Sequence, residues 1–277
     1  MPDYAEEMLV KPGARVKLKE FDAGFHGKHE SHEKALPVIQ AHMQKMDQLQ
    51  YLLYAEKKHS LLIVLQGLDA AGKDGVIRHL MTGMNPEGCR VAGFKQPTPI
   101  ESEHDFLWRI HPHVPATGMV AIFNRSHYED VLVVRVHDLV PEKEWSRHYD
   151  LINDFERLLA VENNTTILKF FLNISKEEQL ERFKCRLDDP TRQWKISESD
   201  YQERGYWDQY MKAFEDVLHK TSTELAPWFV IPSNHKWFRD LAVSQIITSR
   251  MEALQMKSPK PTVDLADIRR KYLKAAA

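Results

Sequence analysis

The sequence predicts an α/β protein whose central sheet is mostly parallel. Short apolar runs alternate along the chain with longer segments of helical periodicity, the pattern that places helices between successive parallel strands. The first of these runs, residues 61–66, is followed by a glycine-rich loop and then by a new helical segment. It is apolar throughout, as expected for a central strand that helices cover on both faces.

The predicted elements follow one another at intervals that suit such a fold. Residues 1–34 are polar and weakly periodic, so we expect an arm on the surface of the domain. Residues 36–59 carry apolar side chains at helical spacing and predict an amphipathic helix. The predicted strands are 61–66, 89–94, 118–123, 165–172 and 228–231, and the helices after the first are 76–84, 101–110, 131–139, 145–161 and 237–256. From residue 258 the chain is rich in proline and charge, and a short helix could form over 264–274.

Composition restricts the class of protein. A chain of 277 residues with 43% hydrophobic and 28% charged residues is typical of a soluble globular protein with a sizeable core. Its apolar runs are far shorter than the ~20 residues of a membrane span, and its N-terminus lacks the pattern of a signal peptide. The two cysteines, Cys89 and Cys185, show no metal-ligand spacing and fit a reducing compartment. We therefore expect a cytoplasmic protein with no membrane partner.

The net charge of −2 argues against a general affinity for polyanions. Basic residues are not interleaved with aromatic residues in a nucleic-acid-binding pattern, so we expect no nucleic acid partner. Any polyanion must bind in a local groove of Lys and Arg side chains.

The loop Gly67-Leu-Asp-Ala-Ala-Gly-Lys73 has the spacing of a phosphate-binding P-loop. Its glycines allow backbone N–H groups to turn toward an anion, and the helix that follows adds the positive end of its dipole. Asp74 occupies the position where Ser or Thr usually binds Mg²⁺, and Asp69 is an additional acid; two acids beside a phosphate indicate a divalent cation. A simple turn between strand and helix is the alternative. The predicted phosphate-binding residues here are Gly67, Ala70, Ala71, Gly72, Lys73, Asp74 and Gly75.

Polar residues at the ends of two further strands predict the rest of the site. Lys95, Asn124 and Arg125 all follow strands, and ligands of parallel sheets bind at this edge. Asn124 stands where related folds carry an acid that orders Mg²⁺. Glu129 is either the missing carboxylate or an acid favoured by a helix start. We interpret Arg125 as a clamp on a phosphoryl oxygen, with a structural salt bridge as the alternative. The predicted metal ligands are Asp69, Asn124 and Glu129.

Residues 175–200 carry a second group of basic side chains. Arg182 and Arg186 are four residues apart and share one helix face. In small-molecule kinases, a helical segment at this point closes over the phosphates as an arginine-bearing lid. The alternative is a charged surface helix, because Glu178 and Arg182 form a favourable i,i+4 pair. We expect an arm over 1–34, one domain over 35–257 with a lid at about 175–200, and a tail over 258–277.

Taken together, these segments resemble the family-2 polyphosphate kinases from roughly residue 20 to 255. The resemblance rests on Gly67-Leu-Asp-Ala-Ala-Gly-Lys73, Phe94-Lys-Gln-Pro-Thr98, Phe123-Asn-Arg-Ser126, Lys169-Phe-Phe-Leu172, Trp194-Lys-Ile-Ser197 and Ala226-Pro-Trp228. It implies a P-loop three-layer α/β/α sandwich of the thymidylate-kinase type with a helical lid. It also implies dependence on Mg²⁺ or Mn²⁺, reversible phosphoryl transfer between inorganic polyphosphate and a nucleotide, and assembly into dimers or tetramers.

One position suggests a subgroup. Many members of that family have Asp where this chain has Asn124, and Asn followed by Arg-Ser-His-Tyr-Glu-Asp looks like class III, which phosphorylates AMP as well as ADP to give ADP and ATP. The resemblance then makes Glu129 the replacement carboxylate. We expect Lys73 to grip the donor phosphates, Asp69 and Glu129 to place Mg²⁺, and Arg125 with a lid arginine to stabilise the transferred group.

Two other functions fit the loop. One is an ATP-dependent nucleoside monophosphate kinase, which would act on ATP and AMP but not on polyphosphate. The other is a regulatory protein that binds nucleotides without turnover, because Asn124 and Asp74 both depart from the usual nucleotidase pattern.

Overall fold

The computed structural model describes residues 3–29 and 31–276. A six-stranded sheet lies at its centre, in the order β1-β6-β5-β2-β4-β3. Every neighbouring pair is parallel except β1 with β6, which is antiparallel. The strands are β1 (Leu9–Val10), β2 (Ser60–Gln66), β3 (Cys89–Gly93), β4 (Val120–Asn124), β5 (Thr165–Asn173) and β6 (Trp228–Pro232).

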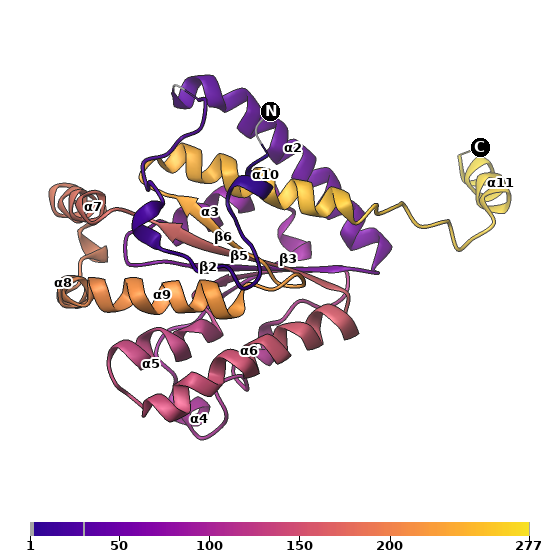
Figure 1. Cartoon of the computed structure of the whole chain (residues 1–277). Helices are drawn as coiled ribbons and strands as arrows, with labels where there is room; N and C mark the ends of the chain where they lie inside the picture. The colour runs from indigo at the N-terminus through magenta and orange to yellow at the C-terminus, as the bar shows by residue number, and fades with distance from the viewer. Residues whose placement is uncertain (1–2, 30, 277) are drawn as a thin grey trace.

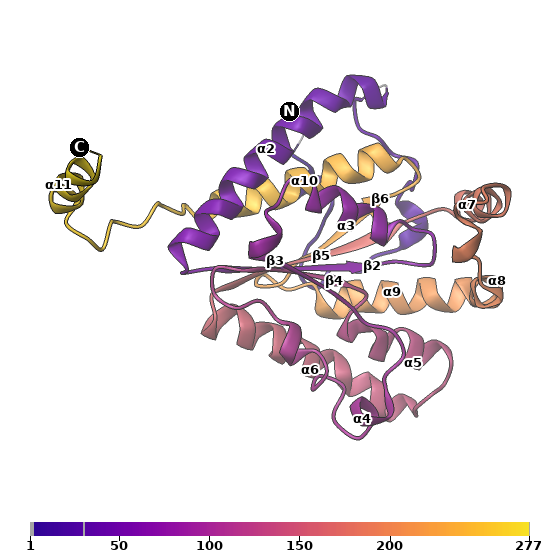
Figure 2. The ribbon, with the colours of Figure 1, turned by 180° about the vertical axis from the view of Figure 1, so that it is seen from behind.

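Helices cover both faces of the sheet and produce three layers (Figures 1 and 2). One face carries α2 (His32–Glu56), α3 (Lys73–Met81) and α10 (Lys236–Ala253), and the other carries α5 (Val133–Val136), α6 (Glu142–Glu162) and α9 (Trp207–Thr221). All seven residues of β2 are buried. Leu61, Ile63 and Leu65 enter one core while Leu62 and Val64 enter the other, which explains why this strand is apolar throughout.

Shorter elements connect the layers. They are α1 (Tyr4–Glu7), η1 (Leu18–Glu20), η2 (Pro86–Gly88), α4 (Pro99–Ser102), η3 (His111–His113), η4 (His127–Val131), α7 (Lys176–Asp188), η5 (Gln193–Lys195), α8 (Glu198–Gly205) and α11 (Leu265–Ala275). No helix in the described part of the chain is long and apolar enough to cross a membrane.

The predicted α/β class and the mostly parallel sheet are confirmed, and all five predicted strands are present. The sequence did not predict β1, which has only two residues and pairs Leu9 with Phe229 and Val10 with Trp228 at the edge of the sheet. A run this short shows no alternation that a pattern could detect. The N-terminal segment also places Tyr4 in the core, with 1% of its surface exposed.

The predicted helix over 101–110 is wrong. Thr98 and Glu101 form a capping box that starts α4, but this helix ends at Ser102. The Asp105 carboxylate then accepts a hydrogen bond from the Leu107 backbone N–H (3.0 Å), which favours a turn over a continued helix. The segment therefore crosses the surface as turns.

A buried ion pair connects the sheet to the helices that carry the site. The Lys169 Nζ on β5 lies 2.6 Å from the Glu156 carboxylate on α6, and both side chains are at most 1% exposed. Lys169 also donates to the Tyr128 hydroxyl (2.8 Å) and to the Thr221 carbonyl (2.7 Å). The Glu156 carboxylate accepts from the Tyr128 hydroxyl (2.8 Å) and lies 3.2 Å from His127 Nε2. The network thus fixes η4, the element that carries Glu129.

We expect Lys169→Met to lower the free energy of unfolding by about 3–5 kcal/mol, because Glu156 would stay buried without its partner. Chemical denaturation measures this loss. The exposed Lys212→Met on α9 serves as a control and should change stability little. A double variant, Lys169→Met with Glu156→Leu, should regain much of the loss. A loss below about 1 kcal/mol in the single variant would contradict the assigned role.

Candidate active site

The glycine loop connects β2 to α3 at the carboxyl edge of the sheet. Gly67 has φ +150°, and a Cβ at this position would lie 2.9 Å from the carbonyl oxygen of Leu172. Gly72 has φ +110° and precedes the first residue of α3, where a Cβ would overlap the guanidinium of Arg239. Both positions require glycine. The loop therefore approaches β5 and α10 closely at these two glycines.

Lys73 is the first residue of α3 and is 9% exposed. Its Nζ donates to the carbonyl oxygens of Gly67 (2.6 Å) and Leu68 (3.2 Å), so it spans the mouth of the loop. Burial, followed by the charge of Arg125, lowers the pKa of Lys73 to about 8, although nearby carboxylates oppose this shift. The amino group is thus charged at neutral pH and becomes neutral as the pH rises past 8.

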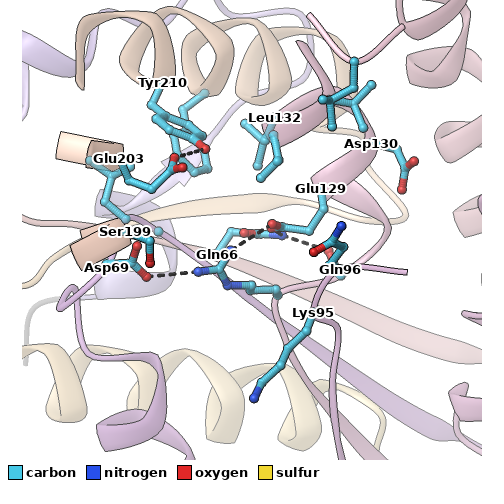
Figure 3. A pocket seen from close by; sticks show the side chains of 18 of the residues that line it. Gln66, Asp69, Lys95, Gln96, Glu129, Asp130, Leu132, Ser199, Glu203 and Tyr210 are labelled. Carbon is cyan, nitrogen blue, oxygen red and sulfur yellow. Dashed lines mark hydrogen bonds and ion pairs between the residues drawn. The ribbon is translucent and has the colours of Figure 1, made fainter. Parts of the chain in front are cut away.

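Arg125 lies between two carboxylates. One of its guanidinium nitrogens is 3.0 Å from Asp69 Oδ1 and another is 3.1 Å from Glu129 Oε2. Gln66, the last residue of β2, donates to the other oxygen of Glu129 (3.1 Å). Figure 3 shows Asp69, Gln66 and Glu129 directed toward this shared point. Glu129 is the largest cause of the raised pKa of Arg125.

Arg125 also has a strained backbone, with φ +63° at a residue that is not glycine. Residues in this region often occur at functional sites. The structure thus brings together three of the predicted catalytic residues, Asp69, Arg125 and Glu129, beside Lys73.

Asn124 does not join that group in this structure. Its Nδ2 donates to Asp74 Oδ1 (2.8 Å), and the other oxygen of Asp74 is 3.7 Å from the Lys195 Nζ. In the described residues, no group of three or more His, Cys, Asp or Glu side chains could hold a metal ion by itself. The oxygen donors of Asp69, Glu129 and Asp74 nevertheless suit a hard divalent cation, which usually binds one or two carboxylates and completes its shell with substrate phosphates.

Arg182 supports the loop from behind. Its Nη1 donates to the carbonyls of Ala70 (2.8 Å) and Ala71 (3.2 Å), and its Nη2 donates to those of Ser233 and Asn234 (2.5 and 2.9 Å). Its Nε donates to Glu178 (2.8 Å), so all five donors of the guanidinium have partners. This arrangement departs from the predicted role of Arg182 as a lid arginine free to contact nucleotide phosphates. The i,i+4 pair is real, but the side chain turns inward under the loop.

We expect Arg182→Ala to lower the free energy of unfolding by about 2–3 kcal/mol, because loop carbonyls would lose their donors. Chemical denaturation, with Lys184→Ala on the exposed side of α7 as a control, measures this change. Unchanged stability with reduced turnover would instead favour the lid role.

The segment predicted as a lid packs over the loop. Arg186 donates to Asp200 (2.9 Å) and so joins α7 to α8. Gln179 donates to the backbone carbonyl of Asp69 (2.9 Å), and Arg204 donates to Gln179 (2.8 Å). Beyond this point Trp194 is 77% exposed on η5. The helices α7 and α8 are therefore tied to the loop, whereas η5 presents an exposed aromatic side chain beside Lys195.

A cavity of about 400 Å³ opens beside the Arg125 group. Its lining contains both apolar and charged side chains. The apolar ones are Leu132, Val133, Val134, Leu139 and Phe214, and the charged ones include Asp69, Lys95, Arg109, Arg125, Glu129 and Asp130. This mixed lining suits a ligand that has both a flat organic group and phosphates.

Two of the charged residues that line the cavity, Lys95 and Asp130, differ in exposure and in the contacts they can make with a ligand. Lys95 is exposed, and Figure 3 shows its side chain directed away from Glu129, while its backbone carbonyl accepts from Arg109 (2.7 Å). Burial above all, with a contribution from Glu129, raises the pKa of Asp130 to about 7. Near neutral pH, Asp130 can therefore donate or accept a hydrogen bond.

Several residues of the site were not predicted from the sequence. Arg109 lies in the segment predicted as a helix, and Asp130 ends the Arg-Ser-His-Tyr-Glu-Asp run but was given no role of its own. Arg239 on α10 packs against the loop, far from it in sequence. Gln66 did carry a signal, because a polar residue that ends an apolar strand at the carboxyl edge of a sheet is placed to contact a ligand.

A phosphate bound in this loop would lie at the start of α3, within reach of Lys73 and Arg125, and this arrangement defines the P-loop kinases. Comparison of the sequence with known families then identifies the family within this class. Residues 27–259 match the profile of the family described as Polyphosphate kinase 2 (PPK2), and the chain belongs to this family.

Similar proteins span nearly the whole chain. An "AMP/ADP-polyphosphate phosphotransferase" of Meiothermus ruber is 50% identical over 256 residues, which cover 91% of this chain and 94% of the relative. An "ADP-polyphosphate phosphotransferase" of Rhodopseudomonas palustris is 41% identical, with 97% of this chain and 98% of the relative covered. The crystal structure of polyphosphate kinase 2 from Arthrobacter aurescens superposes with a TM-score of 0.94 at 42% identity and covers 99% of this chain and 97% of that chain.

Proposed function

We propose that this kinase transfers phosphoryl groups reversibly between inorganic polyphosphate and adenine nucleotides, and that it phosphorylates both AMP and ADP. The observation that carries the proposal is the position of Arg125, held by Asp69 and Glu129 where the phosphate loop meets a cavity of nucleotide size. The similarity to the M. ruber protein, whose name includes both AMP and ADP, supports the choice of acceptors.

The donor and the acceptor would approach from opposite sides. The loop amides and Lys73 would hold the end of the polyphosphate, while the nucleoside would lie against the apolar residues of the cavity with its phosphate toward Arg125. On binding, the guanidinium would exchange carboxylate contacts for phosphoryl oxygens and so neutralise the transferred group. The attacking phosphate oxygen of AMP or ADP is already ionised near neutral pH, so alignment and charge neutralisation supply most of the catalysis.

Asp69 and Glu129, with Asp74 nearby, are the residues that would hold the divalent cation, and we propose Mg²⁺. When bound, the cation would reduce the charge repulsion between donor and acceptor phosphates. Since Arg125 contacts Asp69 and Glu129 in this structure, these residues would have to release the guanidinium in order to bind the cation.

The polyphosphate chain would leave the loop along a basic path. Burial, followed by the charges of Arg182, Arg192 and Arg239, lowers the pKa of Lys236. Arg182 and Arg239 are buried and paired within the protein, whereas Arg192 and Lys236 are exposed and could contact the chain. Such a local concentration of positive charge is what a protein with a net charge of −2 needs in order to bind a long polyanion.

One assay tests the proposal. The enzyme is incubated with long-chain polyphosphate, Mg²⁺ and AMP, and ADP and ATP are followed by chromatography. We expect both products. ADP alone would restrict the acceptor to AMP, and the absence of product would contradict the proposal. Parallel incubation with ATP and AMP without polyphosphate detects the alternative monophosphate kinase, and nucleotide binding without turnover would indicate the regulatory alternative.

A further inference from the structure

The helix α11 stands apart from the body of the protein. Figures 1 and 2 show it beyond an extended segment that leads away from α10 and the sheet. No residue of α11 is buried. In the part of the chain that the structure describes, the hydrogen bonds and ion pairs of this helix all lie within residues 264–276. An isolated helix of this length is marginal in water and needs a partner to be stable.

One face of α11 is apolar and has no partner among the residues that the structure describes. Leu265, Ile268 and Tyr272 are spaced at i, i+3 and i+7, and their exposed fractions are 53%, 44% and 71%. Leu273 beside them is 66% exposed. This spacing aligns the side chains in one stripe along the helix. Arg270 and Lys274 fall on the opposite face, while Arg269 and Lys271 flank the stripe, so the helix is amphipathic and basic.

A matching stripe is exposed on α6. Leu151, Leu158 and Val161 lie at i, i+7 and i+10 and are 47%, 49% and 58% exposed. Asp154 fills the remaining position, i+3, and is also exposed. The stripe borders a groove of about 440 Å³ between α6 and the turn at Leu107 and His111. Apart from Asp154, the stripe has the heptad-like spacing along which two helices can pack in a common seam.

The charges of the two helices are complementary. Within its bounds α11 has four basic residues and one acid, whereas α6 has six acids, of which Glu156 is buried, and three basic residues. Asp154 and Glu162 line the groove itself, together with Arg157, which pairs with Asp154. A basic helix placed along this stripe would therefore meet opposite charge at its rim, which favours this pairing and disfavours α11 pairing with itself.

We propose that α11 of one chain docks along the Leu151–Val161 stripe of α6 in a second copy of the chain, and that the second copy returns the contact. The extended segment points α11 away from its own body in both views, which favours a second chain as the partner. A single helix of 11 residues covers little area, so one contact alone would be weak. A reciprocal exchange forms the contact twice and closes a two-fold pair. This inference does not depend on the proposed function.

Disulfide trapping tests the pairing on the full chain. In a Cys185→Ser background, one chain carries Tyr272→Cys and a second chain, distinguished by a tag, carries Leu158→Cys. Burial raises the pKa of the remaining Cys89 to about 11, so its thiol should react slowly. We expect a covalent product that contains both chains after mild oxidation. Lys274→Cys, on the charged face of α11, is the matched control and should give little product.

Sedimentation of the untrapped protein supplies a second measurement. Ile268→Asp should weaken self-association at least about 30-fold, because it places a charge in the seam. The circular dichroism and thermal unfolding of the body should not change, since α11 has no buried residue. Arg270→Gln on the opposite face is the control and should have a much smaller effect.

Three outcomes would overturn the proposal. The first is a cross-link that forms only within a single chain carrying both cysteines. The second is self-association that Ile268→Asp leaves unchanged. The third is flotation of the protein with vesicles of anionic lipid through α11 in the absence of any cross-link between chains, which would make a membrane surface the partner of this helix.

Discussion

Replacement of Lys73 by methionine is expected to lower kcat/KM for polyphosphate by about 10³-fold while leaving the fold intact. The Nζ of Lys73 lies at the mouth of the loop, 2.6 Å from the carbonyl of Gly67, where the donor phosphates would bind. Methionine preserves most of the volume of the side chain but removes its charge. Steady-state kinetics with polyphosphate and ADP measures the effect, and circular dichroism checks the fold.

The pH dependence of the same residue gives an independent check. The pKa of Lys73 is lowered to about 8, so the ammonium form is present below this pH and is lost above it. We therefore expect kcat/KM of the unmodified enzyme to fall as the pH rises through 8, and Lys73→Arg to move this fall to higher pH. Lys143→Met on the exposed side of α6 is the control. Near-normal rates in Lys73→Met would overturn the assignment.

Arg125→Ala is expected to lower kcat/KM by about 10²- to 10³-fold, because no other cation contacts both Asp69 and Glu129 in the described part of the chain. The two carboxylates would then face the incoming phosphates without compensation. Kinetics with AMP as the acceptor provides the measurement. Arg125→Lys should recover only part of the activity, because an ammonium cannot make the bidentate contact.

The competing interpretation is that Arg125 serves only as a structural salt bridge. It predicts a loss of stability with normal turnover by the protein that remains folded. Added guanidinium ion at low concentration distinguishes the two, since it should partly restore turnover in Arg125→Ala if a guanidinium acts on the phosphates. Arg147→Ala, an exposed residue on α6, should show neither the defect nor the recovery.

The fold could be predicted wherever the hydrophobic pattern is compatible with only one type of structure. The apolar run of β2 has no polar face, so it had to lie in the centre of a covered parallel sheet. The loop that follows a strand and begins a helix fixed the position of Lys73. The segment after α4 has apolar residues at helical spacing, yet it forms turns. The hydrogen bond from the Leu107 N–H to the Asp105 carboxylate favours a turn, and hydrophobic periodicity does not reveal such a bond.

The sequence allowed us to predict which residues form much of the site, but not which side chains contact one another there. Sequence order places Arg125 and Asn124 at the same strand end, yet Asn124 turns toward Asp74 while Arg125 turns toward Asp69. Arg182 illustrates the same limit, because i,i+4 spacing cannot tell whether a guanidinium faces solvent or a neighbouring loop. Side-chain direction depends on packing between distant elements, and a single sequence does not record it.

The two arginines behind the phosphate loop determine whether the loop becomes ordered during folding or only when a ligand binds. Arg182 binds the loop carbonyls and Arg239 packs against Gly72, so the shape of the loop is set when the chain folds. Capture of a phosphate should then require little loss of backbone conformational entropy. Hydrogen exchange would report this directly, with loop amides about as protected in the free enzyme as in the complex, and with faster exchange confined to segments such as η5.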